Sequence, residues 1–414
     1  MIDYSRRNFN SFIWHAVFLA LTLNFVDINT VIPNLILKSG GGPIYLGMLS
    51  AIMIGGTGVM QLFFAGFLIN KPKKKFYLIT GISLRISALL LLGFILFTTG
   101  KNSQTPQGGF LSGPVVILMI MAVFSFSGSF ANISYVDILG KAFPAEKRKR
   151  FFIIKQTISS FGVILSAIIV RVTLGLLPYP FSYALLFTAA GLLLLTASLG
   201  FWRLKEPESK VMKTPSLAKK FTLFKKAVLE DKNLRYYLLL INTSGVILGM
   251  IPFLIGLARK SFNFETEMIG NYLIIQMAGA LCANLLFNLL NKNQKYKGIL
   301  YYFIISAAVI PPAALLLSGY PAIFPLLFIL SGSSLAAYQV AIPGILLEIS
   351  TEENRPVYTG ISGAGSLAVL LFPVIAGLSI EQFGYVPIFL ISSVIILSGM
   401  FFAQRIICTR INKN

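Results

Sequence analysis

Twelve apolar runs, each near twenty residues long, constrain this chain more than any other feature of its sequence. A helix needs about 20 apolar residues to cross the roughly 30 Å hydrocarbon core of a bilayer. Backbone groups cannot stay unpaired in lipid, so each run is predicted to be a transmembrane α-helix. The runs cover residues 12–37, 45–69, 76–98, 113–141, 151–176, 182–203, 236–258, 267–290, 298–318, 322–348, 357–379 and 386–406.

The composition excludes a soluble fold. Only 12% of the residues are charged and 56% are hydrophobic, whereas a soluble domain carries roughly a quarter charged residues. A β-barrel would instead show short segments of alternating hydrophobicity. The sequence therefore predicts an all-α integral membrane protein.

The net charge of +21 reports the topology of the chain. If the N-terminus lies inside, 29 of the 35 Lys and Arg residues fall on segments that face the cytoplasm. This matches the positive-inside rule, and it predicts that both termini are cytoplasmic and that the protein lies in the cytoplasmic membrane. The basicity is thus no sign of a nucleic-acid partner, although part of it is expected to attract anionic membrane lipid.

The longest predicted cytoplasmic segment separates six spans from six more. We therefore expect two pseudo-symmetric bundles, at 1–203 and 236–414, joined by a basic linker at 204–235. Apolar side chains at helical spacing in this linker predict a short amphipathic helix on the membrane surface; a merely solvated linker is the alternative. These side chains are Leu217, Phe221, Phe224 and Val228.

The two halves repeat weakly in sequence. LINKPKKK follows the second span and LLNKNQK follows the eighth, displaced by 221 residues. VIPNLILKS ends the first span and MIPFLIGLARKS ends the seventh, displaced by 219 residues. Internal repeats of six helices are typical of transporters that alternate access by rocking one half against the other.

The six-plus-six layout and the basic loop after the second span resemble the major facilitator superfamily. The family pattern in that loop is Gly, three residues, Asp, Arg, any residue, Gly and two basic residues. Gly66 and the closing pair of lysines fit, while Asn70 replaces the acid, Lys71 the arginine and Lys73 the second glycine. The phrases DINTVIP and FFIIKQ resemble a little-characterised bacterial branch of the superfamily, which implies no particular substrate.

Asp27 is the only acid near the middle of any predicted span. Asn24, Asp27, Thr30 and Asn34 would share one helix face of about 120°, and we expect that face to line a central cavity. An acid inside the membrane is costly and needs a reason. We therefore hypothesise that Asp27 couples transport to protons or binds a cation. Helix packing is the alternative, and a cationic substrate could itself be the partner.

Other charged residues near the ends of spans predict a cytoplasmic gate. We expect Asp137 to form an ion pair with Lys155, with Arg85 nearby. Acids with a downstream arginine resemble the gate charges of sugar-type facilitators, which implies the pairs Asp137 with Arg148 and Glu348 with Arg355. Simple anchoring at the interface is the alternative. The predicted gate comprises Arg85, Asp137, Arg148, Lys155, Glu348 and Arg355.

Neutral polar side chains deep in the spans are candidates for lining a substrate cavity, although any of them could equally make an interhelix hydrogen bond. One histidine and two separated cysteines make a metal site improbable, and no cofactor is predicted. The candidate cavity residues are Asn24, Asp27, Thr30, Gln61, Asn132, Gln156, Asn242, Gln276, Ser334 and Tyr338.

The leading interpretation is a secondary active transporter that moves a small solute together with protons or a cation. The chain has no nucleotide-binding loop, which argues against an ATP-driven pump. A sensor or scaffold on the same fold that transports nothing is the second interpretation. An intramembrane enzyme would need paired acids or a nucleophile and base at one depth, and Asp27 and Asp137 are expected at different depths.

Overall fold

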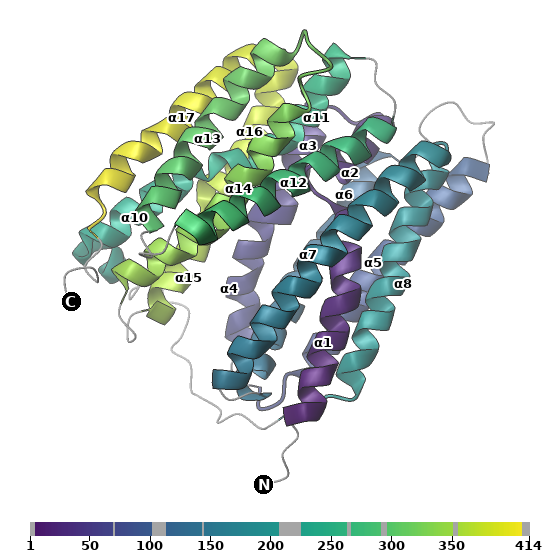
Figure 1. The fold of residues 1–414 in the computed structure, drawn as a ribbon, viewed down its shortest axis with the longest axis vertical. Coiled ribbons are helices and arrows are strands. Elements are labelled where there is room, and N and C mark those ends of the chain that lie inside the picture. The colour runs from purple at the N-terminus through teal and green to yellow at the C-terminus, as the bar shows by residue number, and fades with distance from the viewer. Residues whose placement is uncertain are drawn as a thin grey trace. The chain divides into compact units, whose positions relative to one another are not determined.

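The computed structural model describes residues 5–68, 71–101, 113–142, 145–206, 225–262, 266–290, 296–350 and 355–407. Within these ranges the chain forms helices and no strands (Figure 1). Twelve segments are long and apolar enough to cross a membrane. The twelve predicted spans and the all-α class are thereby confirmed, while the side on which each terminus lies remains a prediction.

Several spans are built from more than one helix. The first six spans contain α1 (Ser5–Thr22), a 3-10 turn (Leu23–Val26), α2 (Val31–Lys38), α3 (Pro43–Ser50), a π-helical turn (Ala51–Gly55), α4 (Gly56–Leu68), α5 (Lys75–Lys101), α6 (Pro114–Ala142), α7 (Ala145–Leu176) and α8 (Phe181–Trp202). The last six contain α10 (Lys232–Ser244), α11 (Val246–Ser261), α12 (Glu267–Leu290), α13 (Tyr296–Leu317), α14 (Leu326–Ile349), α15 (Arg355–Gly365), α16 (Leu367–Phe383) and α17 (Tyr385–Arg405).

Contacts divide the chain into two compact units. Unit 1 comprises Met1–Gly41, Val59–Thr214 and Glu265–Asn271, and unit 2 comprises Gly42–Gly58, Pro215–Phe264 and Tyr272–Asn414. Helix α3, which begins the second span, thus packs with the last six spans, against α11 and α16. The predicted bundles at 1–203 and 236–414 follow the order of the spans, and they remain a prediction. The compact units differ from these bundles at two short segments, Gly42–Gly58 and Glu265–Asn271.

In unit 1, α5 packs against α6 and α8, and α1 packs against α7 and α8. Helices α1 and α8 approach closely at Gly200, where a Cβ atom would lie 2.7 Å from the carbonyl oxygen of Ser11. The beginning of α1 is also tied to the end of the sixth span. Asn8 donates to the carbonyl of Lys205 (2.9 Å) and accepts from the amide of Lys205 (3.0 Å).

Unit 2 repeats this tie with different residues. Helix α10 packs against α17, and α13 packs against α14 and α17. Asn233, at the beginning of α10, donates to the carbonyl of Ile407 (3.2 Å) and accepts from its amide (2.9 Å). Each half therefore closes its first helix onto its sixth with one asparagine that binds both polar groups of a single backbone residue.

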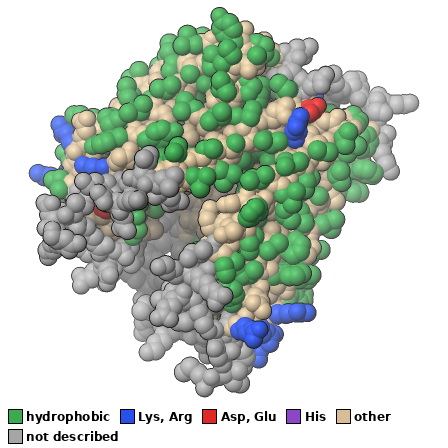
Figure 2. Space-filling model, viewed as in Figure 1, with side chains coloured by type: hydrophobic (Ala, Val, Ile, Leu, Met, Phe, Trp, Pro, Cys, Tyr) green, Lys and Arg blue, Asp and Glu red, His purple; other side chains and the backbone are tan. Residues whose placement is uncertain are grey.

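The outward surface of the helices is apolar. On the face in Figure 2, hydrophobic side chains cover the described helices along most of their length. Large side chains such as Phe161 and Leu316 are 73% and 76% exposed. A soluble protein rarely exposes so much contiguous apolar surface, and a lipid bilayer accommodates it.

The predicted amphipathic helix of the linker lies largely outside the described residues. The described part begins at residue 225 and is helical through residue 230. Asp231 then caps α10 by accepting hydrogen bonds from the amides of Asn233 (2.7 Å) and Leu234 (3.3 Å). The surface helix accordingly stays a prediction.

Candidate functional site

Asp27 lies at an interruption of the first span. Helix α1 ends at Thr22, a 3-10 turn follows, and α2 begins only at Val31. Asp27 itself has extended backbone, with φ −67° and ψ 125°. The expectation of one continuous helix face through this region is therefore wrong, because an extended residue and a turn change the direction in which the following side chains point.

The carboxylate of Asp27 closes the turn that begins α2. Its Oδ1 atom accepts hydrogen bonds from the amide of Asn29 (3.0 Å), the amide of Thr30 (2.7 Å) and the hydroxyl of Thr30 (2.7 Å). This is the task of a helix cap, which satisfies amides that have no partner within the helix. The Oδ2 atom makes no hydrogen bond with the described residues, and the side chain is partly exposed.

The polar neighbours of Asp27 serve helix packing. Asn24 donates to the carbonyl of Val163 (2.6 Å) and to the hydroxyl of Ser166 (3.0 Å) on α7. Thr30 and Asn34 are buried as well, and Asn34 donates to the hydroxyl of Tyr183 on α8 (2.6 Å). The packing alternative therefore describes Asn24 and Asn34, whereas Oδ2 of the Asp27 carboxylate makes no hydrogen bond with the described residues.

The seventh span has only a one-residue irregularity at the matching place. Helix α10 ends at Ser244 and α11 begins at Val246, which is the residue 219 positions after Asp27, and Gly245 between them keeps helical backbone angles (φ −67°, ψ −13°). Shortly before this residue, Asn242 donates to the carbonyl of Gly365 (2.6 Å) and accepts from the amide of Ala368 (2.8 Å). These two groups flank the break between α15 and α16, so Asn242 joins the seventh span to the interrupted eleventh span.

Asp137 forms ion pairs with lysines other than the predicted one. Its Oδ1 lies 2.7 Å from the ammonium of Lys74, and its Oδ2 pairs with Lys141. The expected pair with Lys155 is wrong. Lys141 lies one turn further along the same helix, and the loop before α5 delivers Lys74. The Lys155 ammonium instead lies 5.6 Å from the ring centre of Tyr135.

Glu206 completes this charged network at the end of the sixth span. It accepts hydrogen bonds from the amides of Lys74 (2.8 Å) and Lys75 (2.7 Å). Its Oε1 lies 3.6 Å from the ammonium of Lys141. The network therefore ties together the loop after the second span, the end of α6 and the end of α8. The acids of this network, Asp137 and Glu206, hold the basic loop from outside it. The family pattern instead has an acid within the loop, at the position where this chain has the uncharged Asn70.

Three basic side chains gather in another region of unit 1. Arg85 lies 4.1 Å from the ring centre of Phe124, and its Nε has no hydrogen-bond partner among the described residues. His15 is buried against Tyr135 at 5.7 Å, and its Nδ1 likewise lacks a described partner. Arg85 and Lys155 both lie within electrostatic reach of His15. No described carboxylate forms an ion pair with Arg85 or Lys155.

The remaining gate residues are only partly described. The Oε2 atom of Glu348, near the end of α14, is buried and makes no hydrogen bond with the described part of the chain. The side chains of Arg148 and Arg355 lie outside the described residues. The two pairs implied by the sugar-type resemblance therefore stay predictions.

Two of the neutral candidates in unit 2 are buried without a described hydrogen-bond partner. They are Gln276 on α12, for both atoms of its amide, and Ser334 on α14, for its hydroxyl. The two helices approach where Gly332 lies against the backbone of Gln276. A buried polar group without a partner is costly, so each of these side chains suits a bound water or solute.

The other candidates differ in exposure. Tyr338 lies further along α14, with its ring 5.3 Å from that of Phe303. Asn132 and Gln156 are exposed, and Gln61 is partly exposed. No group of three or more His, Cys, Asp or Glu residues in the described chain could hold a metal ion.

The family model described as Major Facilitator Superfamily matches residues 13–319. The chain belongs to the Major Facilitator Superfamily. The resemblance inferred from the sequence is thereby confirmed. No curated protein matches the chain in sequence.

Solved structures of transporters share the fold at low sequence identity. The nucleoside transporter NupG is 14% identical, with a TM-score of 0.66 and coverage of 98% of this chain and 99% of that one. A bacterial homologue of the iron transporter ferroportin, in its inward-facing state, is 13% identical, with a TM-score of 0.66 and coverage of 97% and 99%. A D-xylose-proton symporter is 14% identical, with a TM-score of 0.65 and coverage of 97% and 96%. The chain is thus a multi-pass membrane transporter and not an enzyme.

Sequence reasoning missed the turn at Asp27, although a signal for it exists. Asp27 followed by Thr30 and then Pro33 is a pattern that favours a turn and a new helix start. The sequence holds no comparable signal for the role of Glu206. Its carboxylate binds the amides of Lys74 and Lys75, which lie more than 130 residues away, and the sequence around Glu206 does not indicate this contact.

Proposed function

We propose that this member of the Major Facilitator Superfamily is a secondary active transporter of the cytoplasmic membrane. It moves a small solute by alternating access and couples that movement to protons or another cation at Asp27. The observation that carries the proposal is the interruption of the first span at an acid. Discontinuous spans form the ion and substrate sites of many transporters, because unwound backbone and helix ends supply polar groups within the membrane.

The second half supports this assignment by contrast. At the equivalent position the seventh span has only a one-residue irregularity at Gly245, and Val246, which cannot titrate, begins the next helix. The extended break and the carboxylate are therefore both properties of one half. One oxygen of Asp27 holds the turn while the other has no described partner. The carboxylate can thus keep its structural bonds while its second oxygen takes and releases a proton or contacts a cation.

The experiment is uptake by the purified protein in proteoliposomes with an imposed pH gradient. Asp27→Asn keeps the shape and an oxygen that accepts the same three hydrogen bonds, but it cannot titrate. We expect this variant to lose pH-driven accumulation while it retains exchange or binding of the solute. Undiminished uphill transport by Asp27→Asn would remove Asp27 from the coupling mechanism. Absence of flux by the wild type across a broad solute panel would favour the sensor or scaffold interpretation.

We further propose that the solute carries negative charge. Arg85, His15 and Lys155 come together from three helices of unit 1, and no described carboxylate pairs with Arg85 or Lys155. Uncompensated charges within a membrane protein are costly, and they commonly mark the path of a substrate or ion. An anionic solute would supply the missing counter-charge. If a proton moved together with the anionic solute, the net charge carried across the membrane would be small.

A thermal-shift screen of anionic, neutral and cationic metabolites tests this charge preference, because a ligand stabilises the state that it binds. We expect stabilisation by anionic compounds, and we expect Arg85→Gln to abolish it. Arg171→Gln is the matched control, since Arg171 is half-exposed and already faces Glu267 at 3.5 Å. Stabilisation by cations alone would contradict the proposal and would favour a cationic substrate that pairs with Asp27.

A further inference from the structure

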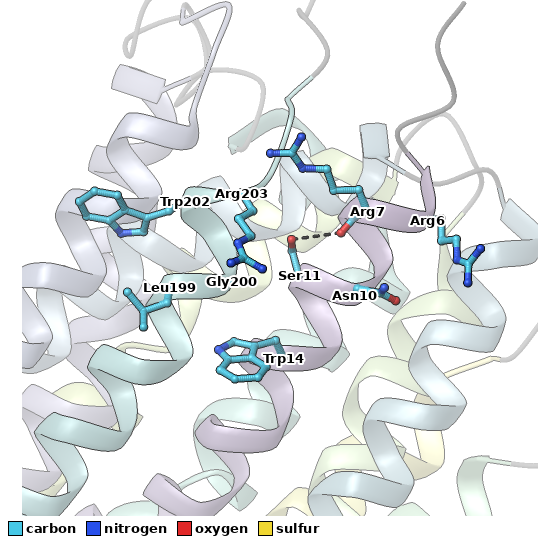
Figure 3. A pocket seen from close by; sticks show the side chains of 9 residues that line it. All are labelled: Arg6, Arg7, Asn10, Ser11, Trp14, Leu199, Gly200, Trp202 and Arg203. Atoms are coloured by element: carbon cyan, nitrogen blue, oxygen red, sulfur yellow. Dashed lines mark hydrogen bonds between the residues drawn. The ribbon is translucent and has the colours of Figure 1, made fainter.

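A groove of about 820 Å³ opens between the beginning of α1 and the end of α8, within unit 1 (Figure 3). Its size falls in the roughly 300–1,000 Å³ range of ligand-binding clefts. The arginines lie at one end of the groove with Trp202 beside Arg203, and Leu199 and Trp14 lie further along the helices. The lining residues are Arg6, Arg7, Asn10, Ser11, Trp14, Leu199, Gly200, Trp202 and Arg203.

Among the residues that the structure describes, no acid lines the basic end of the groove. Arg6, Arg7 and Arg203 are exposed, and none forms an ion pair with a described carboxylate. Figure 3 shows Arg7 and Arg203 near one another at the ends of their helices, with Arg6 on the other side of the first turn of α1. The closest acid in sequence to Arg203 is Glu206, and the amides of Lys74 and Lys75 already occupy it.

Lys75 adds to the positive potential there. Its ammonium donates to the carbonyls of Trp202 and Leu204, at 2.8 Å each, and it lies within electrostatic reach of Arg7. The ammonium thereby satisfies carbonyls at the end of α8 that lack partners within the helix. The groove therefore presents fixed positive charge to an anion, with guanidinium groups that suit the oxygens of a phosphate.

Both tryptophans of the chain line this groove. Trp14 donates from Nε1 to the carbonyl of Thr196 (2.7 Å), which fixes its ring against α8. Trp202 is 66% exposed. Tryptophan is enriched where a membrane protein crosses from hydrocarbon to headgroups, because its ring is apolar and its N–H is polar. Thr196, which binds Trp14, precedes Trp202 on α8, so the two rings lie at different levels and together span the bilayer interface at this groove.

The groove continues into an apolar surface that faces away from the bundle. Leu199, Leu195 and Leu192 follow one another along α8 and are 51%, 43% and 51% exposed. A second groove in unit 1, of about 500 Å³ between α5 and α8, has no charged residue in its lining. Charged lining residues therefore distinguish the first groove from the second. Along the first groove the side chains change from guanidinium groups to leucines, as a lipid changes from a polar headgroup to apolar acyl chains.

We propose that the groove between α1 and α8 binds an anionic phospholipid, with Arg7 and Arg203 on its phosphate. Trp14 and Trp202 lie against the glycerol region, and the leucines of α8 lie against the acyl chains. A lipid held there would bridge the first and sixth helices beside the tie made by Asn8. The proposal does not depend on the nature of the transported solute, because the groove lies within one unit on its lipid-facing side.

Tryptophan fluorescence tests this proposal directly, since the only two tryptophans lie in the groove. The full-length protein is reconstituted in phosphatidylcholine vesicles that contain equal mole fractions of brominated phosphatidylglycerol or brominated phosphatidylcholine, whose bromines quench nearby tryptophan. We expect stronger quenching by the anionic lipid. In Arg7→Gln/Arg203→Gln the preference should fall, by roughly fivefold in relative affinity for each arginine removed.

Two further measurements separate a site from general attraction to the leaflet. Lys225→Gln/Lys232→Gln removes the same charge from exposed positions outside the groove and should leave the preference unchanged. Trp14→Phe leaves Trp202 as the sole reporter, and the preference should keep its sign because Arg7 and Arg203, which hold the phosphate in the proposal, are unchanged. Equal quenching by the two lipids in the wild type, or an unchanged preference in the arginine double variant, would overturn the proposal. Displacement of the lipid by millimolar inorganic phosphate would also overturn it in favour of a soluble anion.

Discussion

The two halves of this transporter share their scaffold and differ in their charges. Asn8 and Asn233 make the same two backbone hydrogen bonds, at distances between 2.9 and 3.2 Å. The first span breaks at Asp27, whereas at the equivalent position the seventh span has only a one-residue irregularity before Val246. The basic cluster around Arg85 likewise belongs to unit 1. Features that repeat between the halves thus build the fold, whereas charges confined to one half require an explanation in function.

The largest effect is expected for the buried ion pairs of unit 1. Asp137→Ala leaves Lys74 without its acid and leaves Lys141 with only Glu206, at 3.6 Å, and we expect a loss of about 2–3 kcal/mol in the free energy of unfolding in detergent. The loss falls below the roughly 3–5 kcal/mol of a fully buried pair, because the Asp137 side chain is 29% exposed.

A double-mutant cycle checks the partner of Asp137. Coupling between Asp137 and Lys74 should reach about 1–3 kcal/mol, as for directly paired groups. Coupling between Asp137 and Lys155 should be close to zero. The reverse result would restore the ion pair that the sequence suggested and would contradict the structure.

The asparagine ties should behave alike in the two halves. Asn8→Ala and Asn233→Ala each remove two hydrogen bonds to one backbone residue, and each should lower the free energy of unfolding by about 1–2 kcal/mol. Chemical unfolding of both variants in the same detergent measures this. Losses that differ by more than twofold would break the equivalence of the two scaffolds.

The cap at Asp27 should be separable from its charge. Asp27→Ala removes the acceptor of three hydrogen bonds and should cost about 1 kcal/mol, the usual value of a helix cap. Asp27→Asn retains an acceptor and should cost much less. The unfolding temperatures of the two variants are measured and compared with that of Val246→Ala. That variant changes the equivalent residue of the second half and removes no cap. Equal losses for alanine and asparagine would show that the charge, rather than the cap, stabilises the turn.

The smallest effect is expected at the exposed ion pair of unit 1. Arg171 and Glu267 approach to 3.5 Å, but their side chains are 49% and 43% exposed. Exposed pairs contribute about 0–1 kcal/mol and are screened by salt. Glu267→Gln should therefore change the unfolding temperature only slightly. A loss as large as that of Asp137→Ala would mean that exposure does not govern the strength of ion pairs in this unit.

The sequence alone determined the class, the spans and the repeat. An apolar run of membrane-spanning length has one common solution, a helix, because its backbone must be paired within the segment. The twelve spans and the family followed from local composition and from short motifs such as the loop after Gly66. The offset of 219 residues aligned Asp27 with Val246, but the sequence analysis did not predict the break at Asp27.

Only the tertiary structure decided which polar groups meet. Asp137 has several lysines within reach along the chain, and the fold brings Lys74 to it from the loop before α5. Asn242 was expected to line a cavity, but it joins α10 to the break in the eleventh span. Contacts of this kind join residues more than 60 and more than 120 positions apart. The partners of these polar side chains depend on how the helices pack against one another. The local sequence pattern does not predict this packing, so the role of a single polar side chain is known only from the assembled structure.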